Sequence, residues 1–126
     1  MTSCKQRTLA GEYEFHGKGL HTGRISTMTL KPAPENTGII FRRVDLGESA
    51  IVEALAENVS STARSTTISK GEASVSTIEH LMSALTGMGV DNAIIDIDNV
   101  EVPILDGSAR YYVEAIAKDG LKEQDA

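Results

Sequence analysis

The sequence predicts an α+β fold: a two-layer sandwich in which a mostly antiparallel or mixed sheet carries two helices on one face. Two observations support this fold class. Glycine, proline and short polar turns interrupt the first two thirds of the 126-residue chain, as is typical of short strands. Two segments with helical spacing then alternate with extended ones, giving the order strands, helix, strands, helix. We expect residues 1–126 to form one domain, long enough to bury a core.

Composition restricts the class of protein. Hydrophobic content of 40% and charged content of 24% are ordinary for a globular domain, and the low aromatic content of 4% requires an aliphatic core. The net charge of −6 argues against nucleic-acid partners and anionic membrane surfaces. A single cysteine, Cys4, excludes an internal disulfide and fits a reducing cytoplasm. The sequence shows no signal peptide and no apolar run long enough for a transmembrane segment.

Alternation and turn residues place the strands. Tyr13 and Phe15 alternate with two glutamates, which predicts a half-buried strand, and the Thr-rich segment 25–31 is expected to return beside it. Further extended segments are expected at residues 39–44, 51–54, 65–69 with 73–75 as a hairpin, 92–98, and 100–105. Pro103 makes the last of these an edge or a bend.

The first helix is predicted to begin at Ser76. Ser76 as N-cap with Glu79 three residues later forms the pattern of a capping box. Apolar side chains then recur at helical spacing, and Gly87 and Gly89 end the helix. The expected inner face consists of Ile78, Leu81, Met82 and Leu85.

The second helix is predicted to follow the capping sequence Asp-Gly-Ser at 106–108 and to run to about Lys118. Gly120 is expected to stop it. Residues 122–126 are polar and resemble the cut end of a linker.

Glu79 and His80 form the strongest functional pattern. A carboxylate directly before an imidazole is the minimum needed to hold a metal and to move protons on a water molecule beside it. Capping of the helix would also explain Glu79. Successive helix residues turn by about 100°, so His80 falls opposite the apolar stripe and is either a solvated surface residue or a ligand at an interface. A catalytic zinc normally takes three protein ligands, and the neighbouring sequence supplies no others.

The glycine-rich segment 17–23 is the second candidate. Three glycines in seven residues let the backbone pass close to a polar group, although the spacing does not match a phosphate-binding P-loop. Within it, His21 is a candidate for substrate contact or proton transfer, while His16 on the preceding strand is more simply structural. The hydroxyl-rich segment 62–67 would line a polar pocket or form an ordinary β surface.

Several of these segments together resemble one family. Residues 17–23 (Gly-Lys-Gly-Leu-His-Thr-Gly), 76–81 (Ser-Thr-Ile-Glu-His-Leu) and 102–109 (Val-Pro-Ile-Leu-Asp-Gly-Ser-Ala) occur in the order and approximate spacing of UDP-3-O-acyl-N-acetylglucosamine deacetylase. The segments 5–9, 31–38 and 87–92 match as well, so the resemblance covers nearly the whole chain.

The resemblance implies a zinc-dependent cytoplasmic hydrolase of lipid A (lipopolysaccharide) biosynthesis. It removes acetate from UDP-3-O-(3-hydroxyacyl)-N-acetylglucosamine, and its fold consists of two similar domains of the ribosomal S5 domain 2-like type. Glu79 would be the general base and His80 a zinc ligand. His21 and Thr22 would lie near the substrate, and the segment with Arg64 and Ser65 would border the sugar site.

The resemblance also implies that this chain is the first of the two domains and is inactive alone. The remaining Zn²⁺ ligands, a His and an Asp, belong to the second, C-terminal deacetylase domain, which would be its partner. We expect the small residues Ser83, Ala84 and Gly87 to face that partner, an idea that fails if they are buried. The alternative is a stand-alone, non-catalytic module of the same fold that binds a UDP-sugar or a protein.

Overall fold

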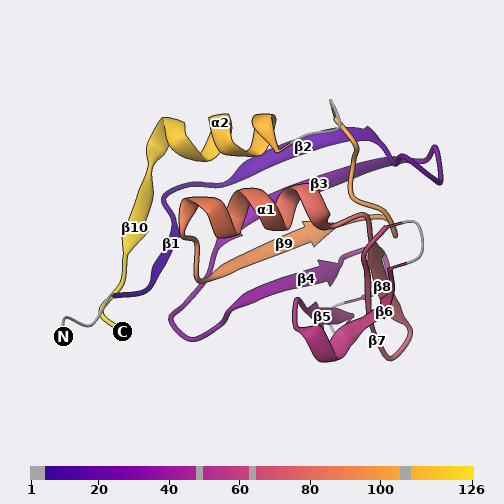
Figure 1. Cartoon of the computed structure of the whole chain (residues 1–126), viewed down its shortest axis with the longest axis horizontal. Coiled ribbons are helices and arrows are strands. Elements are labelled where there is room, and N and C mark those ends of the chain that lie inside the picture. Colours follow the sequence, from indigo (N-terminus) through magenta and orange to yellow (C-terminus); the bar gives the residue numbers. More distant parts are fainter. Residues whose placement is uncertain (1–4, 48–49, 63–64, 106–108) are drawn as a thin grey trace.

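A five-stranded sheet forms the centre of the computed structural model, which describes residues 5–47, 50–62, 65–105 and 109–126 (Figure 1). Its strands, in spatial order, are β2 (Tyr13–Lys18), β3 (Ile25–Pro32), β9 (Ala93–Ile97), β4 (Ile39–Arg43) and β5 (Ile51–Glu53). β4 and β9 run parallel and the other neighbours antiparallel. The expected mixed, mostly antiparallel sheet is confirmed.

Two smaller sheets flank the central one. The first contains β6 (Val59–Ser61), β7 (Thr67–Lys70) and β8 (Ala73–Ser76), so the expected hairpin around residues 70–72 is present; a short 3-10 helix, Ala56–Asn58, precedes it. The second pairs β1 (Arg7–Leu9) with β10 (Leu121–Glu123). Residues 122 and 123, which were expected to belong to a linker, therefore form part of a strand that pairs with the opposite end of the chain.

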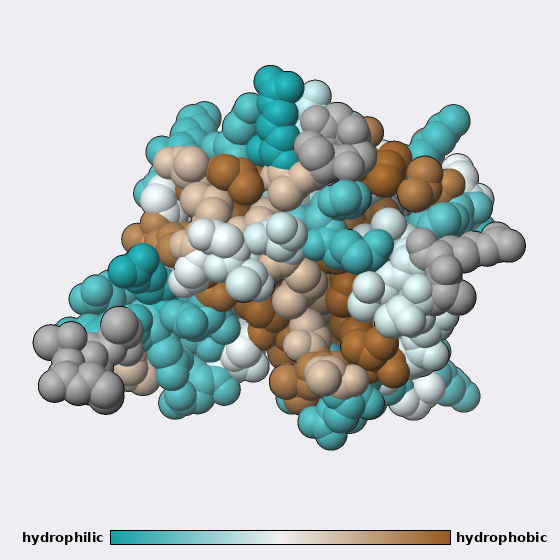
Figure 2. Space-filling view, in the orientation of Figure 1, coloured by the Kyte–Doolittle hydropathy of each residue, from teal (hydrophilic) through white to brown (hydrophobic). Residues whose placement is uncertain are grey.

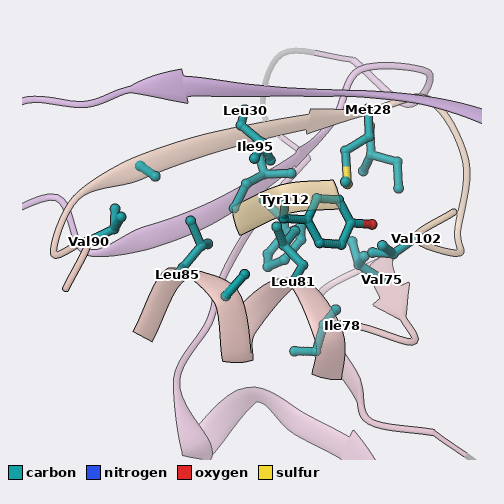
Figure 3. Close-up of a cluster of buried hydrophobic side chains, with 14 of the residues drawn as sticks. Met28, Leu30, Val75, Ile78, Leu81, Leu85, Val90, Ile95, Val102 and Tyr112 are labelled. Carbon is teal, nitrogen blue, oxygen red and sulfur yellow. The ribbon is translucent and has the colours of Figure 1, made fainter. Parts of the chain in front are cut away.

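Both helices cover the same face of the sheet. α1 (Glu79–Met88) contributes Leu81, Ala84 and Leu85 to the core, and α2 (Arg110–Asp119) contributes Tyr112 and Ile116. In β3 every second residue from Ser26 to Leu30 is buried, and Met28 and Leu30 meet side chains of β9 and the helices (Figure 3). The core is largely aliphatic, as the composition required, and the two-layer α+β architecture is confirmed. Among the described residues no helix is long and apolar enough to cross a membrane.

The ends of α1 agree only in part with the prediction. Gly89 adopts the left-handed conformation (φ 80°) and its N–H bonds to carbonyls of the last turn, so the expected stop is confirmed at Gly89, whereas Gly87 lies within the helix. The capping box was wrong: Ser76 belongs to β8, the helix begins at Glu79, and no side chain caps it. Ser76 pairs instead with the segment after β9, where its N–H donates to the Val100 carbonyl at 2.7 Å. Tertiary pairing has thus overridden a local preference.

Candidate functional site

Glu79 and His80 lie together at the exposed start of α1. Both side chains face solvent, whereas the next residue, Leu81, is fully buried. The Glu79 carboxylate is held in place because its Oε1 accepts the backbone N–H of Thr66 at 2.7 Å. The helix therefore presents a fixed carboxylate beside an accessible imidazole, as the position of His80 opposite the apolar stripe predicted.

The rest of this helix face is made of small and weakly polar residues. Ser83 and Gly87 are exposed, but Ala84 is 2% exposed, so the prediction that all three face outward was wrong for Ala84. Ala84 lies three residues after Leu81 and widens the buried stripe. Figure 2 shows pale, weakly polar atoms over α1 with hydrophilic atoms beside its N-terminal end. A second protein surface could approach this face closely.

Thr77 sets the direction in which the helix leaves β8. It has a φ of 61°, which is rare for a β-branched residue, and it is buried. Its N–H donates to the Thr66 carbonyl at 2.9 Å, and its hydroxyl donates to Oε2 of Glu101 at 2.6 Å. These two bonds hold an otherwise unfavourable backbone conformation two residues before Glu79.

The glycine-rich loop that follows β2 is held by the same carboxylate. The N–H of His21 donates to both oxygens of Glu101, at 3.1 and 3.0 Å, and the N–H of Thr22 donates to Oε1 at 2.8 Å. The side chains of His21 and Thr22 are exposed. The structure thus connects two of the predicted segments, 17–23 and 76–80, through one residue that sequence reasoning had not selected.

Glu101 is 1% exposed and lies in the extended segment between β9 and α2. Burial raises the pKa of its carboxyl, but the hydrogen bonds from Thr77, Thr22 and His21 outweigh burial and hold the pKa below its ordinary value. Glu101 is therefore ionised at neutral pH. The signal that could have identified it is an acid in an otherwise apolar stretch, Val-Glu-Val-Pro at 100–103.

The other predicted residues that the structure describes are less closely connected. Ser65 is half-buried beside Thr66, the residue that holds Glu79. Arg64 and the capping sequence 106–108 lie outside the described residues. His16 is exposed on β2 and contacts Thr27 and Glu14, consistent with a structural role.

The described residues do not form a complete metal site. Among them, no group of three or more His, Cys, Asp or Glu side chains is placed to hold an ion. A catalytic zinc takes three protein ligands, and the exposed imidazole of His80 fits the role of one. Fold and site together thus define an α+β domain with an exposed carboxylate–imidazole pair at the start of a helix.

Comparison with known proteins identifies the family. Residues 6–126 match the family model LpxC, UDP-3-O-acyl N-acetylglycosamine deacetylase. The chain is 59% identical over 117 residues to the UDP-3-O-acyl-N-acetylglucosamine deacetylase of Geobacter sp. (strain M21), covering 93% of this chain and 38% of the relative. The chain belongs to this deacetylase family.

Two further relatives extend the comparison. The deacetylase of Teredinibacter turnerae is 52% identical over 122 residues, which are 97% of this chain and 40% of the relative. The "Bifunctional enzyme LpxC/FabZ" of Porphyromonas gingivalis is 52% identical over 121 residues, which are 96% of this chain and 26% of that protein. The chain thus spans about two fifths, or less, of the length of these relatives.

Proposed function

We propose that this chain supplies the general base and one zinc ligand of a deacetylase that acts on UDP-3-O-acyl-N-acetylglucosamine in lipid A biosynthesis. The observation that carries the proposal is the exposed Glu79–His80 pair, with its carboxylate fixed by the Thr66 N–H. The deacetylase names of the relatives support the substrate. The cytoplasmic location implied by the resemblance is part of this proposal.

His80 would be the metal ligand on this chain, and the other ligands would come from residues that the chain does not contain. A zinc ion bound in such a site lowers the pKa of water toward about 7 and polarises the carbonyl under attack. The exposed face of α1, with Ser83 and Gly87, is the surface on which we place the partner that carries the remaining ligands.

Glu79 would take a proton from a water molecule while the oxygen of that water bonds to the acetyl carbon. The C–N bond then breaks, and Glu79 returns the proton to the leaving amine, so that the products are acetate and a free amino sugar. The hydrogen bond from the Thr66 N–H orients the carboxylate. His21 would transfer a proton or contact the substrate from the glycine-rich loop with Thr22, while Arg64 and Ser65 would border the sugar.

The test combines zinc titration with an activity assay. The chain is studied alone and together with the part of the Geobacter relative that it does not match, by calorimetry with Zn²⁺ and by release of acetate from the UDP-sugar. We expect one tight zinc site and activity only when both parts are present. Tight zinc binding by the chain alone would contradict the assignment of a single ligand, and affinity for UDP-N-acetylglucosamine without activity in either case would favour a binding module.

Two substitutions separate the roles of the paired residues. Glu79→Gln should lower kcat by about 10²–10⁴-fold and leave the zinc stoichiometry unchanged, because it removes only a base. His80→Ala should abolish tight zinc binding and activity together. Glu72→Gln, an exposed carboxylate in the turn between β7 and β8, is the control and should change neither.

A further inference from the structure

The segment that carries Glu101 lies between the two parts of the candidate site. On one side it bonds to the end of β8, where the Val102 N–H donates to the Ser76 carbonyl at 3.1 Å. On the other it bonds to the β2–β3 hairpin, where the Ile104 N–H donates to the Lys18 carbonyl at 2.8 Å. Figure 1 shows this segment rising from the end of β9 towards β2. It therefore joins two elements that do not pair with each other directly.

Within this bridge, Glu101 makes the links that reach the functional segments. Its carboxylate accepts the backbone N–H groups of His21 and Thr22 on one side and the hydroxyl of Thr77 on the other. Its own carbonyl accepts the hydroxyl of Ser26 at 3.0 Å. Bonds to a buried, ionised carboxylate are strong, so the loop and the start of α1 share one rigid reference point.

The shape of the loop is adapted to this carboxylate. A Cβ on Gly19 would overlap Oε1 of Glu101 and lie 2.7 Å from its Cδ, so only glycine lets the loop approach so closely. Thr77 holds its positive φ while donating to the same carboxylate. A glycine at one end of the contact and a strained residue at the other indicate that the arrangement serves the site rather than the core.

We propose that Glu101 is a positioning residue that fixes the His21–Thr22 loop relative to the Glu79–His80 pair. It does not touch the substrate itself; it sets where His21 and Glu79 meet the substrate. Its effect on catalysis rests on the proposed deacetylase function, but the positioning itself does not.

The first test measures the chemical shifts of the backbone amides in the 126-residue chain. In ¹H–¹⁵N spectra of Glu101→Gln, which keeps the size of the side chain, we expect the His21 and Thr22 amide protons to move upfield and those of Glu79 and His80 to shift as well. Asp98→Asn is the matched control, because Asp98 also accepts a backbone N–H, from Thr27 at 2.8 Å, but outside this bridge. Unchanged Glu79 and His80 amides in Glu101→Gln, or equal changes in the control, would overturn the proposal.

A second variant covers the case in which Glu101→Gln fails to fold. Thr77→Val replaces the hydroxyl that joins the segment before α1 to the carboxylate with a methyl group of similar size. We expect the Glu79 and His80 amides to shift while those of His21 and Thr22 remain downfield, bound to Glu101. If the Glu79 and His80 amides stay in place, the bridge does not position them and the proposal is wrong.

The catalytic consequence is measured in the two-part activity assay. Because small displacements of catalytic groups are costly, we expect Glu101→Gln to lower kcat by about 10–100-fold with one zinc still bound. An unchanged kcat would show that the positioning has no catalytic role. If the unsubstituted assembly were itself inactive, the proposed function would fail, and the spectra would still decide whether Glu101 positions the two segments.

Discussion

Replacing Thr77 by glycine sets backbone strain against hydrogen bonding. Glycine adopts a φ of 61° freely, which relieves a cost of roughly 1–2 kcal/mol for a residue with a Cβ. Against this, the substitution removes the hydroxyl bond to the Glu101 carboxylate, about 1.5–3 kcal/mol, and the burial of a methyl group, about 0.8 kcal/mol. Glycine also makes the unfolded chain more flexible, which costs about 0.4–1 kcal/mol.

The losses exceed the relief, so Thr77→Gly should lower the free energy of unfolding by about 1–3 kcal/mol. Thr77→Ser keeps the hydroxyl and removes only the methyl, so it should stay within about 1 kcal/mol of the unsubstituted chain. Urea denaturation measures both, and with a slope of about 1–3 kcal/mol per M the glycine variant should unfold at a urea concentration about 1 M lower. A glycine variant as stable as the original would show that relief of backbone strain offsets the lost interactions. An equal loss of unfolding free energy in Thr77→Ser would show that the hydroxyl bond is not the cause.

Three further stability effects follow from the structure. Asp96 accepts bonds from Arg42 and Lys31 at 2.8 and 2.9 Å, so Asp96→Asn should cost about 1–2 kcal/mol of unfolding free energy in urea at pH 7 and low salt, and less in high salt because both cations are partly exposed. Burial raises the pKa of the Asp96 carboxyl, but these two cations outweigh burial and lower the pKa. The stabilisation is therefore complete above the unfolded pKa and is lost as the pH falls below about 4. The decrease in melting temperature between pH 7 and pH 3 should be smaller in Asp96→Asn than in the unsubstituted chain. Gly89→Ala should destabilise α1 by about 1 kcal/mol because φ at this position is 80°. Gly87→Ala should stabilise α1 by about 0.5–1 kcal/mol, because the added methyl group has open space around it and alanine favours a helix. Changes in melting temperature of the same sign for both variants would contradict this reasoning.

Elements with a strong local pattern could be predicted from the sequence, and elements that depend on distant pairing could not. The alternation around Tyr13 and the apolar stripe of α1 are properties of neighbouring residues, so β2 and the body of α1 were predicted correctly. β10 is three residues long and mostly exposed, and it exists because Leu121–Glu123 pairs with Arg7–Leu9 at the other end of the chain. Ser76 shows the same effect, since its pairing with Val100 prevents the capping that its neighbours favour.

The candidate site divides along the same line. Glu79 and His80 are adjacent and on the polar side of a predictable helix, so a pattern search finds them. Glu101 contacts Thr77, which is 24 residues away, and His21, which is 80 residues away, so its role depends on the bend after β9 and on the β2–β3 hairpin. Neither contact leaves a periodic signal in the sequence; only the acid's apolar neighbourhood hints at burial.

The proposed chemistry and the stability of this domain therefore depend on different residues. Glu79 and His80 are exposed and lie outside the core, which is formed by side chains of the sheet and the inner faces of the two helices. Burial of those apolar side chains, the main favourable contribution to folding, does not require the imidazole or the carboxylate to be bound by anything. Thr77 and Glu101 connect the two sets. Both are buried like core residues, but their polar groups hold the glycine-rich loop and the start of α1, which carries the exposed pair. Substitutions there should affect folding and activity together, whereas substitutions at Glu79 or His80 should affect activity almost alone.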